Sequence, residues 1–520
     1  MKLTGEQEQV VSSDARCIVV KALAGTGKTS TLIEFAKRRA RQPMLYVVLT
    51  KSVQLHAEDK FRGTGVVART SHSLAFQAYG KPYRDKLLNT SLKPWQISEA
   101  LKLEDVVSGH VGRNGAMALG AIIGDTLNKF LYSADEGVLP RHAAADEKVV
   151  GRFLPGSGLS EQDAKLFLAE KAGILWGMML DTGNRDVGML HDGYLKLFAM
   201  SSPNLDNYAY LLLDEAQDLN PCTLNIMNKQ QTGKCFIGDS NQHLFGFRGA
   251  RNALGVALRQ GGSPYHLTGS FRFGGNIAHV ANTVLRQKLE KARVQGLGGD
   301  DAIRRLGASE PFTTLCRANA TVFGETADAI EKGRPWFHVG GTPRYRFEQV
   351  LDVHWLSKRQ KHTVKDSFIA TFSNLDEYAE YADEASDAEA MSRVKIVKRY
   401  GDKIPSILDA INARRGAAAS EEGAMRLIAN THVVKGMEYD KVRLADDFIE
   451  MYELPDVDGL APDQQRIVMA PHLDDLAILY VAVTRARKVL ELNKDLSDVL
   501  AAERQAERRS RAAGGCLAQD

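Results

Sequence analysis

Short, continuous runs of apolar residues recur along the chain, and such runs are typical of strands buried on both faces of a parallel sheet. They lie at residues 17–21, 44–49, 208–213, 234–237, 312–316 and 442–444. The segment 30–41, which follows the first run, has the pattern of a helix. Because strands that alternate with helices pack into layered parallel sheets, this order predicts an α/β fold.

Two longer segments interrupt this alternation. Residues 81–203 are rich in leucine, alanine and lysine, and residues 343–415 are polar and helical with an acidic stretch at 376–389. We therefore expect one α/β domain at 1–80 and 204–270, a second at 271–342 and 416–500, helical insertions at 81–203 and 343–415, and a charged tail at 501–520. The tail is interpreted as a solvated helix end, with a minor nucleic-acid contact as the alternative.

The composition is that of an ordinary folded protein. Of the 520 residues, 44% are hydrophobic and 25% are charged, which excludes a disordered or collagen-like chain. The net charge of +3 permits a polyanionic partner but does not by itself predict one. The five cysteines form no C-x-x-C pair, so we expect no structural metal and no disulfide framework. No stretch reaches the roughly 18 apolar residues of a membrane span, so we expect a cytoplasmic protein that contacts no membrane.

Residues 22–29 have the pattern of a phosphate-binding loop, with Ala22 in place of the first glycine of the usual motif. The loop follows a predicted strand and precedes a predicted helix. Glycines let the backbone N–H groups curl around phosphate oxygens, Lys28 neutralises phosphate charge, and the Thr29 hydroxyl can hold Mg²⁺. We expect nucleotide contacts from Ala22, Ala24, Gly25, Thr26, Gly27, Lys28 and Thr29.

An acidic pair, Asp214 and Glu215, ends the apolar run at 208–213 and is followed by Ala-Gln-Asp. A carboxylate at the end of such a strand can hold Mg²⁺ through water, and its neighbour can orient the water that attacks the terminal phosphate. We therefore expect Asp214 to share a Mg²⁺ ion with Thr29, and Glu215 to act in catalysis. Together with the loop, the pair predicts a site that hydrolyses a nucleoside triphosphate.

Further motifs follow in an order that resembles the superfamily 1A DNA helicases of the UvrD, Rep and PcrA kind. The strings that carry the resemblance are residues 3–7, 238–242 continuing into 245–250, 271–272, 431–438 and 480–487. The resemblance implies two RecA-like P-loop domains with parallel sheets, each with a helical accessory insertion, of which the second is reduced. It also implies that ATP, with Mg²⁺, binds between the two domains.

The resemblance implies roles for single residues as well. At the nucleotide, Gln7 would pair with adenine, Phe271 would stack on it, Glu438 would hold the ribose, and Gln242, Arg272 and Arg485 would act at the γ-phosphate, Arg485 as an arginine finger. On the DNA side the candidates are Phe245, Phe247, His72 and His432. A phenylalanine is more often a core residue and a histidine more often a structural one, so only the motif positions favour DNA contact.

Three more strings, at residues 70–75, 191–197 and 442–448, resemble the F-box DNA helicases and their bacterial homologues. We expect no F-box, because the adenine motif begins at Leu3, and we expect a bacterial or phage source. Two positions depart from the family. Leu49 stands where many relatives have a DNA-stacking phenylalanine and Ser30 where many have an adenine-packing arginine, so neither role is transferred.

These patterns predict an ATP-dependent DNA helicase or translocase that moves 3′-to-5′, with single-stranded or tailed duplex DNA as its partner. The alternative is an ATP-gated DNA-binding subunit that regulates a partner nuclease or recombination protein without unwinding. Strand separation on a tailed duplex distinguishes the two. A P-loop kinase or GTPase would leave Arg485 and Gln242 unexplained.

Overall fold

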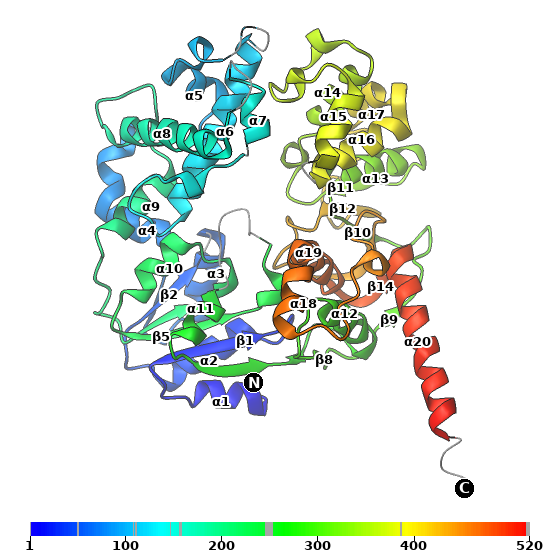
Figure 1. Cartoon of the computed structure of the whole chain (residues 1–520). Coiled ribbons are helices and arrows are strands. Elements are labelled where there is room, and N and C mark those ends of the chain that lie inside the picture. The colour runs from blue at the N-terminus through cyan, green and yellow to red at the C-terminus, as the bar shows by residue number, and fades with distance from the viewer. Residues whose placement is uncertain are drawn as a thin grey trace.

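Two six-stranded sheets, each with all of its strands parallel, form the framework of the chain (Figure 1). The computed structural model describes residues 2–48, 51–107, 109, 112–145, 147–154, 159–244, 253–384 and 387–515. We call residues 2–267, built on the first sheet, the first lobe, and residues 269–515, built on the second sheet, the second lobe. Parallel sheets interleaved with helices confirm the predicted α/β fold.

The first sheet has the strand order β3-β2-β4-β5-β1-β6. Its strands are β1 (Cys17–Ala22), β2 (Met44–Val48), β3 (Val66–Thr70), β4 (Tyr210–Leu213), β5 (Gly233–Gly238) and β6 (Ser263–Leu267). The four inner strands are the apolar runs predicted for this part of the chain. Strands β3 and β6 lie at the edges and alternate buried with more exposed side chains, so no continuous apolar run marks them in the sequence.

The second sheet has the order β11-β12-β10-β13-β14-β9. Its strands are β9 (Ala302–Ile303), β10 (Phe312–Cys316), β11 (Trp336–His338), β12 (Arg426–Asn430), β13 (Tyr439–Leu444) and β14 (Ala486–Glu491). Strand β10 coincides with the predicted run, and β13 extends the predicted run toward the N-terminus. A separate parallel pair, β7 (Gly269–Ser270) with β8 (Gln295–Gly296), lies at the entry to the second lobe.

Helices cover both faces of the first sheet. They are α1 (Gly5–Val11), α2 (Lys28–Arg38) and α3 (Lys51–Lys60) on one face, and α10 (Pro221–Asn228) and α11 (Ala253–Arg259) on the other. Helix α2 begins two residues earlier than predicted, because Gly27 has a left-handed φ of 77° and ends the loop there. The helix also ends at Arg38 rather than at residue 41.

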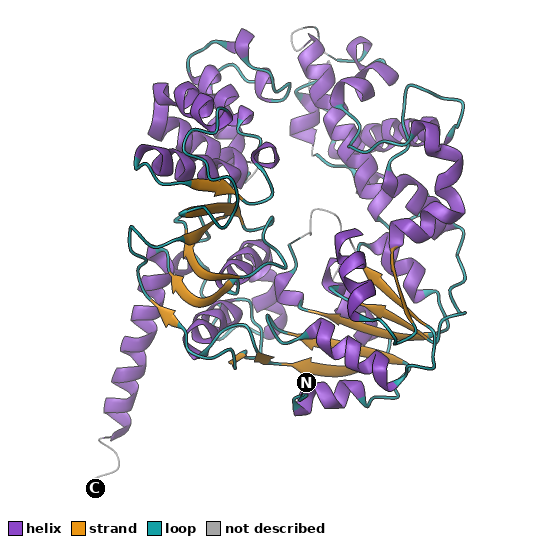
Figure 2. Cartoon of the chain, turned by 180° about the vertical axis from the view of Figure 1, so that it is seen from behind, coloured by secondary structure: helices purple, strands orange, loops and turns teal. Residues whose placement is uncertain are grey.

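A helical region adjoins each sheet at the same end of the molecule (Figures 1 and 2). The region beside the first sheet contains α4 (Ser71–Ala75), α5 (Pro94–Ala100), α6 (Gly112–Tyr132), α7 (Glu147–Gly151), α8 (Glu161–Leu180) and α9 (His191–Met200). The region beside the second contains α14 (Glu348–Ser357), α15 (Leu375–Glu384), α16 (Ala388–Tyr400) and α17 (Ile404–Asn412). The two regions meet where Arg152 Nη1 lies 3.1 Å from Glu377 Oε1.

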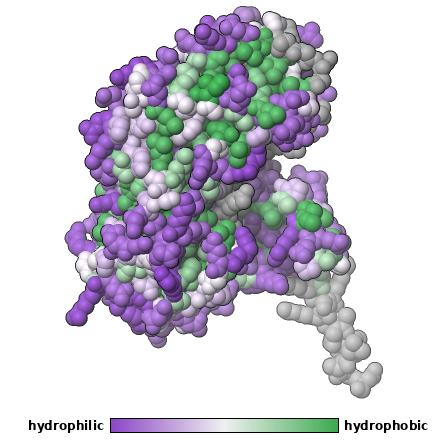
Figure 3. All heavy atoms as spheres, turned by 60° about the vertical axis from the view of Figure 1, so that its left-hand side comes forward, coloured by the Kyte–Doolittle hydropathy of each residue, from purple (hydrophilic) through white to green (hydrophobic). Residues whose placement is uncertain are grey.

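The second lobe is completed by α12 (Gly275–Gln287), α13 (Asn319–Glu331), α18 (Pro462–Met469), α19 (Leu473–Val483) and α20 (Lys494–Gly515). Helix α20 projects away from the rest of the molecule (Figure 1), and its first turns are held by the buried side chains of Leu496 and Leu500 and by bonds of Glu503 to α12. Among the described residues, no helix combines the length and the hydrophobicity needed to cross a membrane. On the face seen in Figure 3, hydrophilic residues cover most of the lower part, and apolar residues reach the surface mainly above.

Candidate active site

A cleft with a volume of about 1170 Å³ lies between the two lobes. The predicted site residues that line it are Gly25, Thr26, Gly27, Lys28, Thr29, Asp214, Glu215, Gln242, Phe271, Arg272, His432, Glu438 and Arg485. Residues that are hundreds of positions apart in the chain therefore face one common space.

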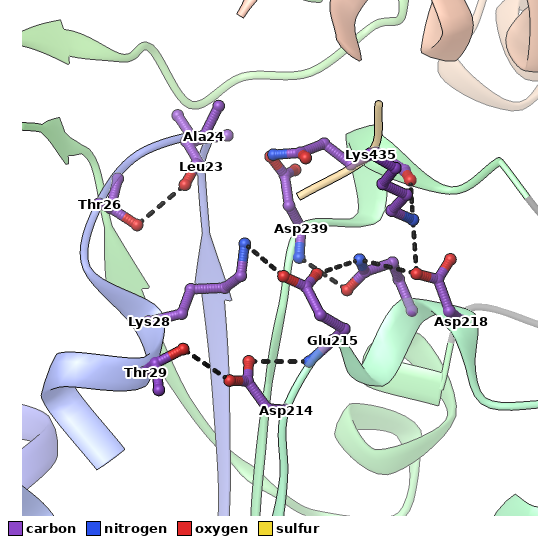
Figure 4. A network of polar contacts seen from close by, with 12 residues as sticks. Leu23, Ala24, Thr26, Lys28, Thr29, Asp214, Glu215, Asp218, Asp239 and Lys435 are labelled. Atoms are coloured by element: carbon purple, nitrogen blue, oxygen red, sulfur yellow. Dashed lines mark hydrogen bonds and ion pairs between the residues drawn. The ribbon is translucent and has the colours of Figure 1, made fainter. Parts of the chain in front are cut away.

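The loop between β1 and α2 depends on two glycines. Gly25 and Gly27 have φ values of +75° and +77°, in the left-handed region that favours glycine. A Cβ atom on Gly25 would also lie 2.4 Å from the Ser270 hydroxyl oxygen, so a side chain is excluded by contact as well. Thr26 Oγ1 donates a hydrogen bond of 2.9 Å to the Leu23 carbonyl (Figure 4). The loop is thus shaped before any ligand binds.

Two predicted alanines of the loop are buried and offer backbone rather than side chain. Ala22 ends β1, where it pairs with Leu267 of β6, and its side chain is 1% exposed. Ala24 is fully buried, and its N–H donates a 3.2 Å hydrogen bond to the Tyr480 hydroxyl on α19 of the second lobe. The phosphate-binding loop is therefore in direct contact with the other lobe.

Lys28 and Glu215 form an ion pair at the centre of the cleft, with 3.4 Å between Nζ and Oε1 (Figure 4). Burial opposes the charge of Lys28, but Glu215, Asp239 and Asp214 outweigh it and raise the pKa of the lysine. Burial would raise the pKa of Glu215, but Lys28 and Lys435 outweigh it and lower that pKa to about 2. Glu215 also has a left-handed φ of +50°, a strained conformation of the kind that clusters at functional sites.

Thr29 and Asp214, the predicted Mg²⁺ residues, lie in direct contact. Thr29 Oγ1 donates a hydrogen bond of 2.9 Å to Asp214 Oδ2, and the Tyr46 hydroxyl donates one of 2.7 Å to the same oxygen. Burial and the nearby Glu215 raise the pKa of Asp214. Sequence reasoning missed Tyr46, whose only signal is a hydroxyl-bearing side chain inside the apolar run of β2, the strand next to β4.

A chain of amides and carboxylates holds Glu215 in place. Gln217 Nε2 donates a hydrogen bond of 2.6 Å to Glu215 Oε2, and Gln217 Oε1 accepts one of 3.0 Å from the Asp239 N–H. Gln242 Nε2 in turn donates a hydrogen bond of 2.8 Å to Asp239 Oδ2. The turns η5 (Ala216–Asp218) and η6 (Ser240–Gln242) are therefore linked at the ends of neighbouring strands.

Arg485 reaches Gln242 from the second lobe. Its Nη2 donates a hydrogen bond of 3.2 Å to Gln242 Oε1, while Nε and Nη1 donate bonds of 3.0 and 3.1 Å to the carbonyls of Val481 and Met437. The side chain is buried, and burial, followed by the neighbouring Arg272, lowers the pKa of Arg485 to about 9. The guanidinium group therefore stays charged at neutral pH and is aimed at the cleft from the side opposite Lys28.

Arg272 and Glu438, predicted to contact different parts of the nucleotide, are paired with each other. Arg272 Nε donates a hydrogen bond of 2.9 Å to Glu438 Oε2, and Nη1 donates one of 3.0 Å to the Thr484 carbonyl. Arg487 Nη1 lies 3.6 Å from the other oxygen of Glu438. These side chains lie on the second-lobe wall of the cleft. A bound nucleotide would compete with their mutual hydrogen bonds.

Lys435 makes a further polar link between the lobes, which sequence reasoning did not assign. Its Nζ lies 2.5 Å from Asp218 Oδ2 and donates a hydrogen bond of 2.6 Å to the Gln242 carbonyl. None of the described residues hydrogen-bonds to Asp218 Oδ1, which is buried, and burial raises the pKa of this carboxyl. The only signal in the sequence is the position of Lys435 within the string at 431–438.

The two residues predicted to contact adenine differ in solvent exposure. Phe271 is 40% exposed, and its N–H donates a hydrogen bond of 2.9 Å to the Gly25 carbonyl, so its ring stands at the mouth of the loop. Gln7 is 1% exposed, with Nε2 bonded to the Thr26 carbonyl at 3.3 Å and Oε1 accepting from the Thr4 N–H at 3.0 Å. Pairing with adenine remains a prediction for Gln7, and it requires the amide to become exposed.

The residues predicted to contact DNA differ in where they lie. Phe245 and Phe247 lie outside the described residues, as does Leu49. His72 is away from the cleft, where its Nε2 lies 3.0 Å from Asp192 Oδ1 on α9. His432 lines the cleft, and burial, followed by Arg317 and Lys435, lowers its pKa to about 4, so its ring is neutral at physiological pH.

The chain is similar to a known protein family and to known proteins. A family model described as the UvrD/REP helicase N-terminal domain matches residues 199–260. F-box DNA helicase 1 from Gallus gallus is 32% identical over 521 residues, which cover 96% of this chain and 50% of the relative. F-box DNA helicase protein 1 from Schizosaccharomyces pombe is 29% identical over 554 residues, which cover 100% of this chain and 60% of the relative. The chain thus spans 50 to 60% of the length of these relatives. Both are eukaryotic, which does not fit the predicted bacterial or phage source.

Proposed function

The chain belongs to the superfamily 1 helicases of the UvrD/Rep kind, and we propose that it is an ATP-dependent DNA helicase that moves 3′-to-5′ on single-stranded DNA. The observation that carries this proposal is the 3.2 Å contact between Arg485 of the second lobe and Gln242 of the first, in the cleft that also contains Lys28 and Glu215. A nucleotide bound in this cleft touches both lobes. Its hydrolysis can therefore change how the lobes meet.

ATP is the substrate that the loop accommodates. The loop N–H groups and Lys28 bind its phosphates, and Lys28 then exchanges its ion pair with Glu215 for phosphate oxygens. This exchange removes the main charge that lowers the pKa of Glu215, so the carboxylate becomes a better proton acceptor. Glu215 orients a water molecule for in-line attack on the γ-phosphorus. It accepts a proton from this water as the new P–O bond forms and the bond between the γ-phosphorus and the ADP oxygen breaks.

Thr29 and Asp214 fit a Mg²⁺ ion, because a hydroxyl oxygen and a carboxylate oxygen already lie 2.9 Å apart at the end of the loop. Oxygen ligands of this kind are those that Mg²⁺ prefers. When bound, the ion would neutralise charge on the β- and γ-phosphates. Tyr46 orients the Asp214 carboxylate by its hydrogen bond to Oδ2.

Arg485 and Arg272 supply positive charge from the second lobe. Charge that develops on the transferring phosphoryl group is stabilised by preorganised donors in a site that excludes water, and an arginine finger is worth roughly 10³ to 10⁵ in rate. Gln242 holds Arg485 and hydrogen-bonds to Asp239, so it links the charge to the network around Glu215. Loss of the γ-phosphate would remove the ligand that these groups share and let the lobes separate.

Movement on DNA would follow from this closing and opening. We propose RecA-like domains at 1–80 with 204–270 and at 271–342 with 416–500, insertions at 81–203 and 343–415, and base stacking or backbone contact by Phe245, Phe247, His72 and His432. Stacking on aromatic side chains is worth roughly 1 to 3 kcal/mol per base and does not depend on sequence. The relatives are named DNA helicases, which supports DNA as the partner.

The deciding experiment compares strand separation on 3′-tailed, 5′-tailed and blunt duplexes, with Lys28→Ala as the inactive control. We expect ATP-dependent separation of the 3′-tailed duplex alone. Separation only with a 5′ tail would overturn the polarity. DNA-stimulated ATP hydrolysis without separation of any duplex would instead identify a DNA-binding subunit that regulates a partner nuclease or recombination protein.

A further inference from the structure

Tyr480 lies within α19, and its side chain is fully buried where that helix meets the first lobe. The apolar cluster that contains Tyr480 also contains Leu23, Ala24 and Leu244, which belong to the first lobe. Helix α19 thus packs against both the phosphate-binding loop and the segment after η6. A phenylalanine ring would serve this packing equally well, so the hydroxyl group needs its own explanation.

The Tyr480 hydroxyl faces two groups of the first lobe. The Ala24 N–H donates a hydrogen bond to the hydroxyl oxygen at 3.2 Å, and the Asp239 carboxylate is close enough for its charge to act on the hydroxyl. Burial and the charge of Asp239 raise the pKa of Tyr480 well above its usual value, so the donor keeps its proton. The hydroxyl therefore bonds to the loop and lies beside the residue that precedes η6, across the lobe boundary.

The same network continues to the arginine finger. Asp239 Oδ2 accepts a hydrogen bond of 2.8 Å from Gln242 Nε2, and Gln242 Oε1 accepts one of 3.2 Å from Arg485. Tyr480 and Arg485 lie at the end of α19 and just after it, and they are hydrogen-bonded to the phosphate-binding loop and to η6, respectively. These two cross-lobe bonds from one short segment restrict both the position and the rotation of α19.

We propose that Tyr480 is a positioning residue that makes closure of the lobes set Arg485 in register with Gln242 and the phosphate-binding loop. This inference rests on the proposed ATP hydrolysis. A sliding or rotated α19 would leave the Tyr480 hydroxyl and the Ala24 N–H buried without partners, which is costly, whereas the docked register satisfies both. Misplacement of a catalytic group by about 1 Å can lower a rate on the order of 10²-fold. The position that α19 takes on closure therefore affects how fast Arg485 lets the reaction run.

The test is Tyr480→Phe, which keeps the ring and removes only the hydroxyl. We expect kcat of the DNA-stimulated ATPase to fall about tenfold, because closure then strands the Ala24 N–H. The KM for ATP should change less than about twofold, since nucleotide contacts of the first lobe are intact. The matched control is Tyr345→Phe, which removes the hydroxyl of another buried tyrosine in the second lobe, bonded to the Val339 carbonyl. Its kcat should equal that of the native chain.

A double-mutant cycle separates positioning from general packing. If Tyr480 acts through Arg485, Tyr480→Phe should lower kcat about tenfold in the native chain and less than about twofold in an Arg485→Lys background. Equal losses in both backgrounds would overturn the proposal. So would a Tyr480→Phe variant with native kcat.

Lobe closure gives a readout that does not need hydrolysis. Arg62 and Ile467 are exposed on the first and the second lobe, respectively, and unnatural amino acids at these positions can carry two dyes. Energy transfer between the dyes reports closure when a non-hydrolysable ATP analogue and single-stranded DNA are added. We expect a smaller closed fraction for Tyr480→Phe than for Tyr345→Phe, and equal fractions would contradict the inference. If the native chain closes but hydrolyses no ATP, the proposed function fails while this comparison still tests Tyr480.

Discussion

Replacing Lys435 with methionine removes the cation that joins the lobes at Asp218. The two side chains are 11% and 2% exposed, and Nζ lies 2.5 Å from Oδ2. Removal of one partner from a pair buried to this degree leaves an uncompensated charge, which costs about 3 to 5 kcal/mol. The two residues belong to different lobes, so this loss weakens the closed cleft rather than the fold of either lobe. Within the part of the chain that the structure describes, no residue hydrogen-bonds to Asp218 Oδ1, so Lys435 is the main group that favours the charged carboxylate.

The assay is the steady-state ATPase rate with saturating single-stranded DNA. If the whole loss falls on the closed state, kcat drops by a factor of roughly 10² to 10⁴. The control is Lys441→Met, which breaks a 2.7 Å pair with Glu310 in the second lobe, where the side chains are 32% and 26% exposed. Because a solvated pair is worth about 0 to 1 kcal/mol, its kcat should change less than about fivefold.

A charge-balanced variant checks the physical cause. In Lys435→Met with Asp218→Asn no charge remains buried, so part of the lost kcat should return. A single variant with kcat within about threefold of the native value would refute the reasoning, because the pair would then contribute no more than a solvated one. A double variant no better than the single one would show that Lys435 serves the phosphates rather than the contact between the lobes.

The other predictions concern the cleft, DNA binding and two histidines of the second lobe. Lys28→Ala should abolish ATP turnover with an unchanged circular dichroism spectrum. Glu215→Gln should still bind ATP and DNA but retain unhydrolysed ATP in filter-binding assays. Appreciable turnover in either variant would contradict the role proposed for that residue. DNA affinity measured by anisotropy should fall with salt at a log-log slope of about −0.7 per phosphate contacted, and a flat response would argue against backbone-dominated binding. Burial lowers the pKa of His338 and of His432 to about 4. Since the unfolded chain binds these protons near pH 6.5, thermal stability should decline as pH falls from about 6.5 to 4. Replacing both histidines with glutamine should flatten that decline, and an unchanged profile would show that other groups cause it.

The local chemistry of the nucleotide site can be predicted from the sequence, because it depends on neighbours in the chain. The conformation of the loop needs Gly25 and Gly27 at φ values near +75°, and no long-range contact is required to recognise that pattern. Asp214 and Glu215 are recognisable in the same way, since they end a strand whose apolar run is itself a local signal. The inner strands of the first sheet were predictable for the same reason, whereas the edge strands, with one face open, carry no such run.

Only the tertiary structure decided how the two halves of the site meet. Tyr46 touches Asp214 because β2 and β4 are neighbours in the sheet, and Lys435, Tyr480 and Arg485 reach the first lobe across hundreds of residues. Such contacts leave no period or spacing in the sequence, because each is set by the packing of whole elements. The sequence alone predicted a phosphate-binding loop, a base and a magnesium-binding carboxylate in the first lobe. The packing of α19 and of the loop after β12 against that lobe placed Arg485, which the resemblance had implied, and added Lys435 and Tyr480, which it had not, since a hydrogen bond forms only where folding has brought both partners within about 3 Å.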